Sequence, residues 1–300
     1  MKSSGLFPGF IQHRVEVGDP GENVTIHCEV GGNGPALLLL HGYPQTHVIW
    51  HKVAGKLSQS HTVVCADLRG YGDSSKPPGT PDHANYSKRT MARDQVRLMK
   101  ALGHKQFAVV GHDRGGRVAH RMARDFRDVV EKLCVLDISP TLTMYENTTM
   151  EFARAYYHWF FLIQPAPFPE TLIKHDPKYY LPWTSGGRHG KTNAYTASEA
   201  IAEYERCFCD PAAIHASCED YRASASVDLE HDRADLADKL RCPLLALWGE
   251  KGVVHRLFNP IKDWSAVANE VRGKVLPSGH FIPEEVPELL LAELIPFLAK

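Results

Sequence analysis

The sequence predicts an α/β fold: a mostly parallel sheet of about eight strands, flanked by helices and carrying one helical insertion. Short apolar runs alternate with amphipathic stretches, which is typical of strands and helices built around a parallel sheet. Between residues 141 and 238 this alternation stops, and aromatic residues, prolines and histidines become frequent. We therefore predict a core domain of residues 1–140 and 239–300 and a helical cap domain of residues 141–238.

The individual elements follow from the same pattern. Two runs near the amino terminus are predicted to form a hairpin: Gln12–Val17 and Val24–Val30. Six further apolar runs are predicted to be strands buried on both faces: Ala36–Leu40, Thr62–Ala66, Phe107–Val110, Lys132–Leu136, Leu244–Trp248 and Val271–Leu276. The predicted core helices are His47–Leu57, Lys88–Leu102, Gly115–Phe126, Ile261–Ala268 and Pro287–Ala299.

Composition limits the class of protein. Three hundred residues with 43% hydrophobic side chains suffice for one sizeable core. The net charge of -1 and the absence of a Lys/Arg-rich block argue against a nucleic-acid or membrane partner and favour a small-molecule substrate. The seven cysteines are scattered, and we expect buried thiols in a reducing cytoplasm rather than a zinc site. No signal-peptide core and no membrane-spanning run is seen.

The most informative motif is Gly111-His112-Asp113-Arg114-Gly115-Gly116, which lies between a predicted strand and a predicted helix. A serine at the centre of such an elbow attacks acyl carbon. A carboxylate suits a saturated carbon that bears a leaving group, because the product is an alkyl ester that water can split. The alternative for Asp113 is a helix cap, but the three glycines favour a tight nucleophile elbow.

A base and an orienting acid complete the predicted catalytic group. His280 follows the last predicted strand, where the histidine of a hydrolase triad falls in chain order, and would activate water rather than the nucleophile. Its alternative is a loop histidine without a role. Asp137, at the end of a predicted strand, is favoured over Glu250 as the acid that orients the imidazole. Its alternative is a strand-end cap or salt bridge.

Residues around the elbow supply binding groups. The backbone amides of Tyr43 and Arg114 are predicted to stabilise an oxyanion. Arg114 and Arg117 lie on one helical face beside the nucleophile, so we predict that they bind a substrate carboxylate, although pairing with Asp113 or with cap acids is the alternative. The segment from Asp67 to Ser74 is predicted to be a structural loop with internal charge pairing.

The chain resembles the fluoroacetate dehalogenases, also called haloacetate dehalogenases, of the α/β-hydrolase superfamily. The resemblance spans nearly the whole chain and rests on HGYPQTHVIW, DLRGYGDSSKP, GHDRGGRVAHRMA, VLDISPT, AYYHWFFLIQPAPFPE and DPAAIHASCEDYRA. Arginine directly after the nucleophile and a His-Trp pair in the cap are features of that family. Tyr43 stands where relatives often carry phenylalanine.

The resemblance implies a function for each matching residue. Asp113 resembles the family's nucleophile, His280 its base and Asp137 its acid. Arg114 and Arg117 resemble the carboxylate clamp. The halide pocket is represented by His158, Trp159 and Tyr221, which an aromatic cluster alone would have assigned to core packing.

The resemblance further implies a cofactor-free and metal-free hydrolysis of haloacetates through an aspartyl ester, by a homodimer with no macromolecular partner beyond its own copy. An epoxide hydrolase is the nearest alternative, since it uses the same Asp-His core with tyrosines in the cap. A non-catalytic receptor for a small acid is a third interpretation, against which the complete triad argues.

Overall fold

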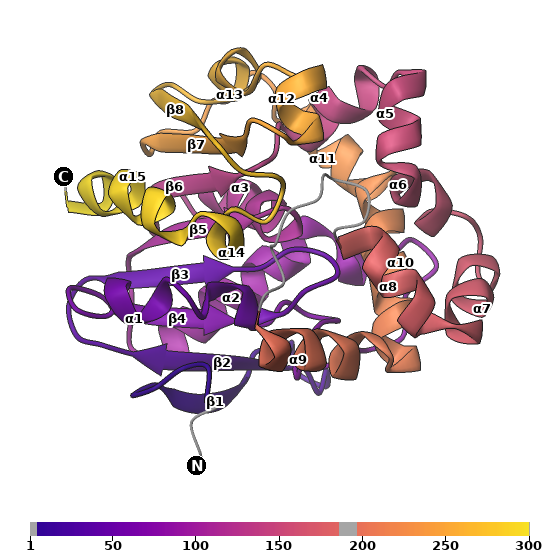
Figure 1. Cartoon of the computed structure of the whole chain (residues 1–300), viewed down its shortest axis with the longest axis horizontal. Coiled ribbons are helices and arrows are strands. Elements are labelled where there is room, and N and C mark those ends of the chain that lie inside the picture. Colours follow the sequence, from indigo (N-terminus) through magenta and orange to yellow (C-terminus); the bar gives the residue numbers. More distant parts are fainter. Residues whose placement is uncertain (1–4, 186–196, 300) are drawn as a thin grey trace.

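An eight-stranded sheet forms the centre of the computed structural model, which describes residues 5–185 and 197–299 (Figure 1). The strands lie in the order β1-β2-β4-β3-β5-β6-β7-β8. Their bounds are β1 (Ile11–Glu16), β2 (Thr25–Gly31), β3 (Ala36–Leu40), β4 (Thr62–Ala66), β5 (Phe107–His112), β6 (Val130–Leu136), β7 (Leu244–Gly249) and β8 (Val271–Leu276). Strand β2 is antiparallel to both of its neighbours, and the strands from β4 to β8 run parallel. The predicted α/β class and the amino-terminal hairpin are thus confirmed.

The central strands are rich in apolar residues because helices cover both faces of the sheet. Strands β3 and β5 are completely buried, which agrees with the prediction. The prediction was wrong for β8, whose four central residues are exposed. This strand pairs only with β7 and forms the edge of the sheet, where Arg272 and Lys274 remain in water and discourage pairing with another chain.

The core helices include all five predicted segments, one of them with a different structure, and three short helices that were not predicted. They are η1 (His47–Trp50), α1 (Ala54–Leu57), η2 (Ala84–Tyr86), α2 (Lys88–Ala101), α3 (Arg114–Asp125), α12 (Val253–Leu257), α13 (Pro260–Val267), α14 (Ile282–Glu285) and α15 (Pro287–Ala299). The single helix predicted for His47–Leu57 is wrong, because the segment forms two short helices. It contains Val48, Ile49 and Val53, which are β-branched and favour a helix only weakly.

In the described residues, eight helices lie between β6 and β7, within the segment predicted to form a cap. They are α4 (Thr141–Glu146), α5 (Met150–Ala155), α6 (Tyr157–Leu162), α7 (Phe168–His175), α8 (Pro177–Ser185), α9 (Ser198–Phe208), α10 (Pro211–Ser224) and α11 (Val227–Ala234). Most of them gather at one end of the sheet, on the right in Figure 1. Helix α10 contacts α6, α7, α9 and α11, so it is the central helix of this group.

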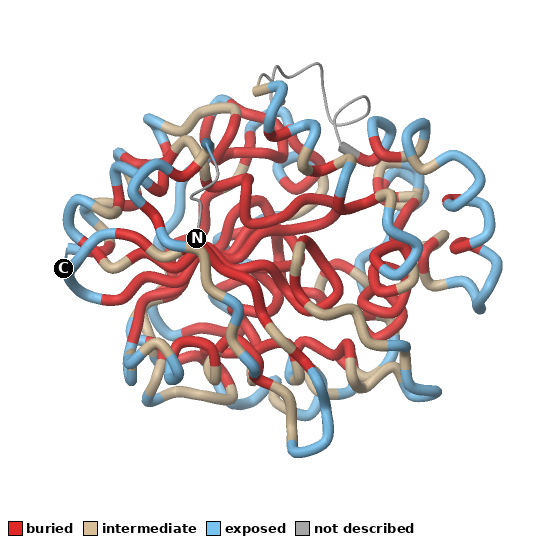
Figure 2. Tube along the Cα trace, turned by 90° about the horizontal axis from the view of Figure 1, so that it is seen from below, coloured by how far each residue is buried: buried red, intermediate tan, exposed pale blue. Residues whose placement is uncertain are grey.

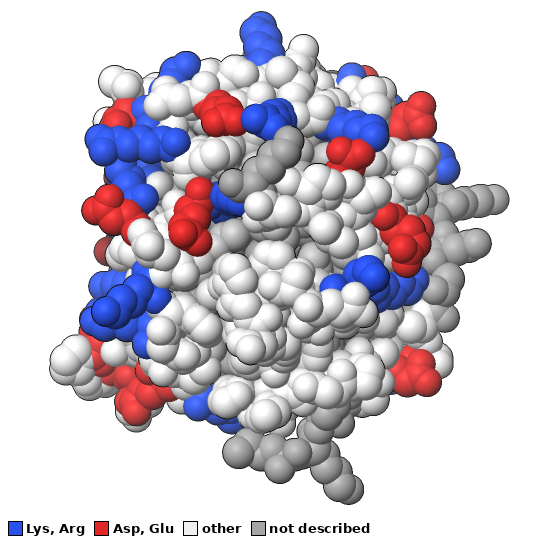
Figure 3. Space-filling view, turned by 90° about the vertical axis from the view of Figure 1, so that its left-hand side faces the viewer, with Lys and Arg blue, Asp and Glu red and all other residues white. Residues whose placement is uncertain are grey.

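Burial is concentrated in the sheet, as the red central strands of Figure 2 show. Lysine and arginine are interspersed with aspartate and glutamate on the face drawn in Figure 3, without a broad area of one sign. This face therefore offers no basic surface for a polyanion. In the described part of the chain, the helices are all too short or too polar to cross a bilayer.

Candidate active site

Asp113 lies at a strained elbow between β5 and α3. Its φ of 47° and ψ of -114° place a non-glycine residue in a region that L-residues rarely adopt. The surrounding glycines make this turn possible. A Cβ added to Gly115 would lie 2.3 Å from the carbonyl oxygen of His41, and one added to Gly111 would lie 2.5 Å from that of Gly115. The side chain of Asp113 makes no capping hydrogen bond to α3, so the alternative of a helix cap is not realised.

The loop after β3 forms one wall around the Asp113 carboxylate. The backbone N–H of Tyr43 donates to Oδ1 of Asp113 at 3.0 Å. Gly42 permits this approach, because a Cβ added there would lie 2.5 Å from Cβ of Asp113. One carboxylate oxygen is therefore held by a backbone donor, in the place where an oxyanion would need one.

His280 and Asp137 meet from opposite parts of the chain. Nδ1 of His280 lies 2.6 Å from Oδ2 of Asp137, and Oδ1 of Asp137 accepts from the backbone N–H of Gly249 at 3.0 Å. Asp137 directly follows β6, and His280 lies in the segment after β8. The carboxyl ends of β6 and β8 lie at the same edge of the sheet as the carboxyl end of β5, which precedes Asp113. The alternative acid, Glu250, is exposed.

The charges of this group are set by its burial and its neighbours. Burial alone would raise the pKa of Asp113, but the charges of His280 and Arg117 lower it to about 2. Burial alone would lower the pKa of His280, yet the hydrogen bond and charge of Asp137 raise it above its usual value. Asp113 is thus an anion at neutral pH, and the proton on His280 is stabilised.

Arg114 is fully buried and pairs with an acidic side chain of the protein, Asp220. Its Nε lies 2.9 Å from Oδ2 of Asp220, and its Nη2 lies 2.7 Å from Oδ1. The alternative left open from the sequence, pairing with an acid of the cap, is therefore realised for Arg114. Its Nη1 has no hydrogen-bond partner among the described residues, so one donor remains for a ligand.

Arg117 is held differently, by neutral groups. Its Nη1 donates to Oγ1 of Thr141 at 2.9 Å and to the carbonyl oxygen of Ser139 at 3.2 Å. Its Nε is buried without a partner in the part of the chain that the structure covers. Burial lowers the pKa of Arg117, while the charge of Asp113 opposes that shift.

Asp220 is the centre of a buried polar group that sequence reasoning missed. Besides pairing with Arg114, Asp220 accepts a hydrogen bond from the hydroxyl of Tyr71 at 2.6 Å. It also forms an ion pair with Lys88. The tyrosine lies in the loop between β4 and η2, the lysine on α2, the arginine on α3 and the aspartate on α10. No local sequence pattern links these four residues. The only available signal was chemical, since a buried arginine requires a buried acid.

Four aromatic side chains form the opposite wall of the site. The ring of Tyr43 stacks on that of His158 with centroids 6.0 Å apart, and the ring of Tyr221 meets the Tyr43 ring edge-on at 5.3 Å. The guanidinium carbon of Arg114 lies 4.1 Å from the ring centroid of Tyr221, and that of Arg117 lies 4.7 Å from the Trp159 ring. The structure therefore brings the predicted binding residues together.

Two of these aromatic side chains carry buried donors that are not used. Nε1 of Trp159 and the hydroxyl of Tyr221 have no hydrogen-bond partner among the residues described. Together with Nη1 of Arg114 and Nε of Arg117, they make four unsatisfied donors in one region. A buried donor without an acceptor is costly, so this arrangement is suited to an anionic or strongly hydrogen-bond-accepting ligand.

Comparison with known proteins agrees with this site. The family model for the alpha/beta hydrolase fold matches residues 35–285. A fluoroacetate dehalogenase from Burkholderia sp is 49% identical over 94% of this chain and 92% of its own. A soluble epoxide hydrolase from Corynebacterium sp. (strain C12) is 36% identical over 91% of this chain and 93% of its own.

Solved structures give the same result. A protein from Nostoc sp PCC 7120 that bears a provisional alpha/beta hydrolase name superimposes with a TM-score of 0.93 and 54% identity, over 96% of this chain and 98% of its own. The fold, the elbow and the sequence matches lead to one assignment. The chain belongs to the alpha/beta hydrolase fold family and, within it, to the family of the fluoroacetate dehalogenase.

Proposed function

We propose that this protein hydrolyses haloacetates, such as fluoroacetate and chloroacetate, to glycolate and halide through an ester of Asp113. The observation that carries the proposal is the set of four unused buried donors around an ionised aspartate. A haloacetate offers two acceptors to such donors, its carboxylate and its leaving halide. The 49% identical fluoroacetate dehalogenase supports the same reaction.

In the first step, Nη1 of Arg114 and Nε of Arg117 hold the substrate carboxylate. Oδ1 of Asp113 is engaged by the Tyr43 amide, so Oδ2 attacks the carbon from the side opposite the halide. The C–O bond forms as the carbon–halogen bond breaks, and the halide leaves with the bonding electron pair. At a substituted carbon, as in a 2-halopropionate, this displacement inverts the configuration.

The leaving halide is received by the aromatic wall. Trp159 and Tyr221 donate from their indole N–H and phenol O–H, and His158, 6% exposed beside them, supplies an imidazole donor. Fluoride gains the most from this pocket, because it is strongly hydrated and the pocket must replace that water. Loss of one donor is expected to lower the rate about a hundredfold.

In the second step, water attacks the ester carbonyl carbon of Asp113. His280, oriented by Asp137, takes a proton from the water, and the Tyr43 amide, with the Arg114 amide as its proposed partner, stabilises the oxyanion. The ester C–O bond then breaks, glycolate leaves with the proton from His280, and the carboxyl group of Asp113 loses the remaining water proton to solvent, which restores the carboxylate. No cofactor or metal takes part in the proposed steps.

The experiment that tests this function is halide release from fluoroacetate and chloroacetate, followed with a halide-selective electrode. Asp113→Asn is the control and should release no halide. An epoxide hydrolase is the second candidate, favoured by the 36% identical relative and by the unused Tyr221 hydroxyl. A diol assay with a neutral epoxide runs in parallel, and diol formation without halide release would overturn the proposal.

Other expectations belong to the same proposal. The helices of residues 141–238 act as a cap domain that closes the site, and the protein works as a cytoplasmic homodimer. Support for the dimer comes from exposed apolar side chains on neighbouring cap helices: Phe168 and Leu172 on α7, and Tyr179 and Trp183 on α8. Light scattering of the purified protein measures the dimer directly, and a monomer at all concentrations would contradict it.

A further inference from the structure

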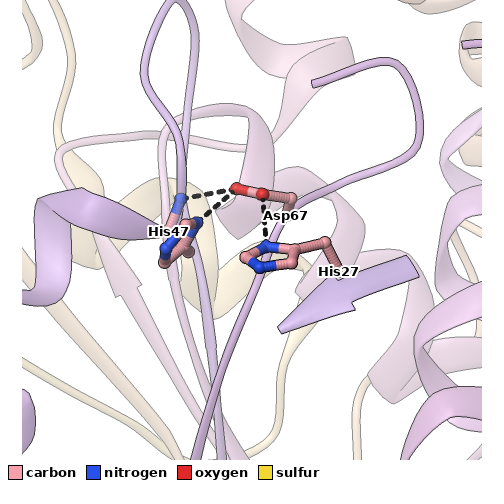
Figure 4. Close-up of side chains that lie close together, drawn as sticks. All are labelled: His27, His47 and Asp67. Carbon is pink, nitrogen blue, oxygen red and sulfur yellow. Dashed lines mark hydrogen bonds and ion pairs between the residues drawn. The ribbon is translucent and has the colours of Figure 1, made fainter. Parts of the chain in front are cut away.

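A second group of potentially reactive side chains lies apart from the Asp113 elbow, on and next to strand β2. His27 on β2, His47 on η1 and Asp67 after β4 offer ligand atoms that all lie within 4.8 Å of one another, and all three residues are buried. Figure 4 shows the two imidazole rings directed at the Asp67 carboxylate from different elements. Nδ1 of each histidine is 2.9 Å from an oxygen of Asp67.

A buried carboxylate without a partner lies in the same place. Glu29 is two residues after His27, so both side chains project from the same face of β2. Its exposed fraction is 0%, and neither carboxylate oxygen has a hydrogen-bond partner among the described residues.

His27, His47 and Glu29 line one pocket of about 320 Å³, which we call the β2 pocket, and Asp67 is hydrogen-bonded to both of these histidines. Its walls include His27, His47 and Glu29, and three further acids lie around them: Asp73, Glu199 and Glu203. The one arginine of the lining, Arg206, already pairs with Asp73 at 2.8 Å and Glu203 at 2.6 Å. Its charge is therefore taken by those two acids, and among the described residues no lysine or arginine forms an ion pair with Glu29.

We propose that the β2 pocket binds one divalent transition-metal ion of the zinc type, with His27, His47, Asp67 and Glu29 as its ligands. Two imidazoles and two carboxylates are a ligand set that suits Zn²⁺. Two carboxylates balance the charge of the ion, so the metal removes the penalty of leaving Glu29 unpaired. Each histidine binds the metal through Nδ1 as a neutral imidazole whose one ring proton lies on Nε2, and the two metal–nitrogen bonds replace the two histidine–Asp67 hydrogen bonds.

The groups behind the ligands fit this role. Oδ1 of Asp67 accepts from the backbone N–H of His47 at 2.8 Å, and Oδ2 accepts from that of Asp73 at 3.0 Å. Both bonds remain when the carboxylate binds a metal, and both fix its orientation. The side-chain amide of Gln12 lies 2.7 Å from Nε2 of His27, where its oxygen can accept the Nε2 proton of a metal-bound imidazole.

A comparable cluster in the cap serves as a contrast. Glu170, His215 and Glu219 also lie within ligand distance of one another. There Nη1 of Arg222 is 2.7 Å from a carboxylate oxygen of each glutamate. A cation of the protein already occupies the position that a metal would need, so this cluster should not bind one.

The test is zinc binding by the full-length protein after removal of metal with EDTA. Titration against a chromophoric chelator should show one high-affinity Zn²⁺ per chain, and Zn²⁺ should raise the melting temperature. Glu29→Gln should weaken binding at least about tenfold, whereas His215→Asn, in the contrasting cluster, should leave affinity and stoichiometry unchanged. Co²⁺ in place of Zn²⁺ should give the intense visible bands of a tetrahedral site.

Three results would overturn the proposal. They are no bound Zn²⁺ in the wild-type protein, equal affinity of the wild type and Glu29→Gln, or binding that His215→Asn removes. If Glu29→Gln does not fold, the wild-type stoichiometry and the Co²⁺ spectrum still decide, since an octahedral or absent spectrum excludes this ligand set. These readouts do not depend on halide release, so they are independent of the proposed dehalogenation.

Discussion

Replacing Asp220 with asparagine should weaken substrate binding although Asp220 touches no substrate. Asp220 accepts hydrogen bonds from Nε and Nη2 of Arg114 at 2.9 and 2.7 Å. This leaves Nη1 of Arg114 as the donor for the substrate carboxylate. The neutral amide in Asp220→Asn cannot accept both bonds and leaves two buried cations, Arg114 and Lys88, without their shared anion. We expect a loss of about 3–5 kcal/mol in the free energy of unfolding, the usual effect of breaking a buried ion pair.

The effect on catalysis is a loss of orientation. Because the guanidinium is no longer fixed, kcat/KM for fluoroacetate should fall roughly 10- to 100-fold, or about 1.4–2.7 kcal/mol. Most of the change should appear in KM, since the carboxylate is held equally in the ground state and the transition state. Acetate, a non-reacting mimic, should lose affinity as an inhibitor in parallel.

The matched control for this experiment is Tyr71→Phe. It removes one hydrogen bond to Asp220 and keeps the pair with Arg114, so KM should change by no more than about threefold. The assay is steady-state halide release, with circular dichroism to confirm folding. A folded Asp220→Asn protein with an unchanged KM for fluoroacetate and an unchanged inhibition constant for acetate would refute the reasoning.

Three further predictions follow from the site. Trp159→Phe removes an unused indole N–H and should lower kcat for fluoroacetate about a hundredfold, with a smaller loss for bromoacetate; equal losses would argue against a halide pocket. Because the pKa of His280 is raised and ester hydrolysis needs the neutral ring, kcat should fall as the pH drops through a value above 6.5. Asp137→Asn should shift this fall in kcat to lower pH and reduce kcat roughly 10³- to 10⁴-fold. A fall at the same pH as in the wild type would contradict the pairing of His280 with Asp137. Burial raises the pKa of Glu284 to about 8, so the folded state binds more protons between about pH 4.5 and 8 and loses stability as pH rises across this window. Glu284→Gln should therefore be the more stable protein at pH 9, by at most about 5 kcal/mol, and similar at pH 4; thermal denaturation at both pH values measures this.

Much of the fold could be predicted because its signals are local. The run Ala36–Leu40 is apolar throughout and becomes β3 with the predicted bounds, since only a strand covered on both faces has this composition. Predictions failed where tertiary position decided the outcome. Strand β8 was predicted to be buried like β7, but it carries Arg272 and Lys274, and its place at the edge of the sheet leaves them exposed.

The residues of the site likewise fall into those that a local sequence pattern predicts and those that only tertiary contacts bring together. The elbow around Asp113 is encoded within six residues, because a Cβ added to Gly115 would lie only 2.3 Å from the carbonyl oxygen of His41 and one added to Gly111 only 2.5 Å from that of Gly115. The partner of Arg114 could not be predicted, since Asp220 is 106 residues away and nothing in the local pattern links the two. The β2 pocket was hidden for the same reason: His27, His47 and Asp67 come from separate elements, and Asp67 was predicted only as part of a charge-paired loop.

The central claim, that Asp113 is the nucleophile and His280 acts only on the ester, can be tested by trapping. His280→Asn is mixed with chloroacetate, and the products are analysed by halide measurement and by mass spectrometry of the peptides. The account predicts release of one halide per active site and a stable carboxymethyl group on the peptide that contains Asp113. Continued turnover without an adduct, or an adduct on another residue, would contradict it.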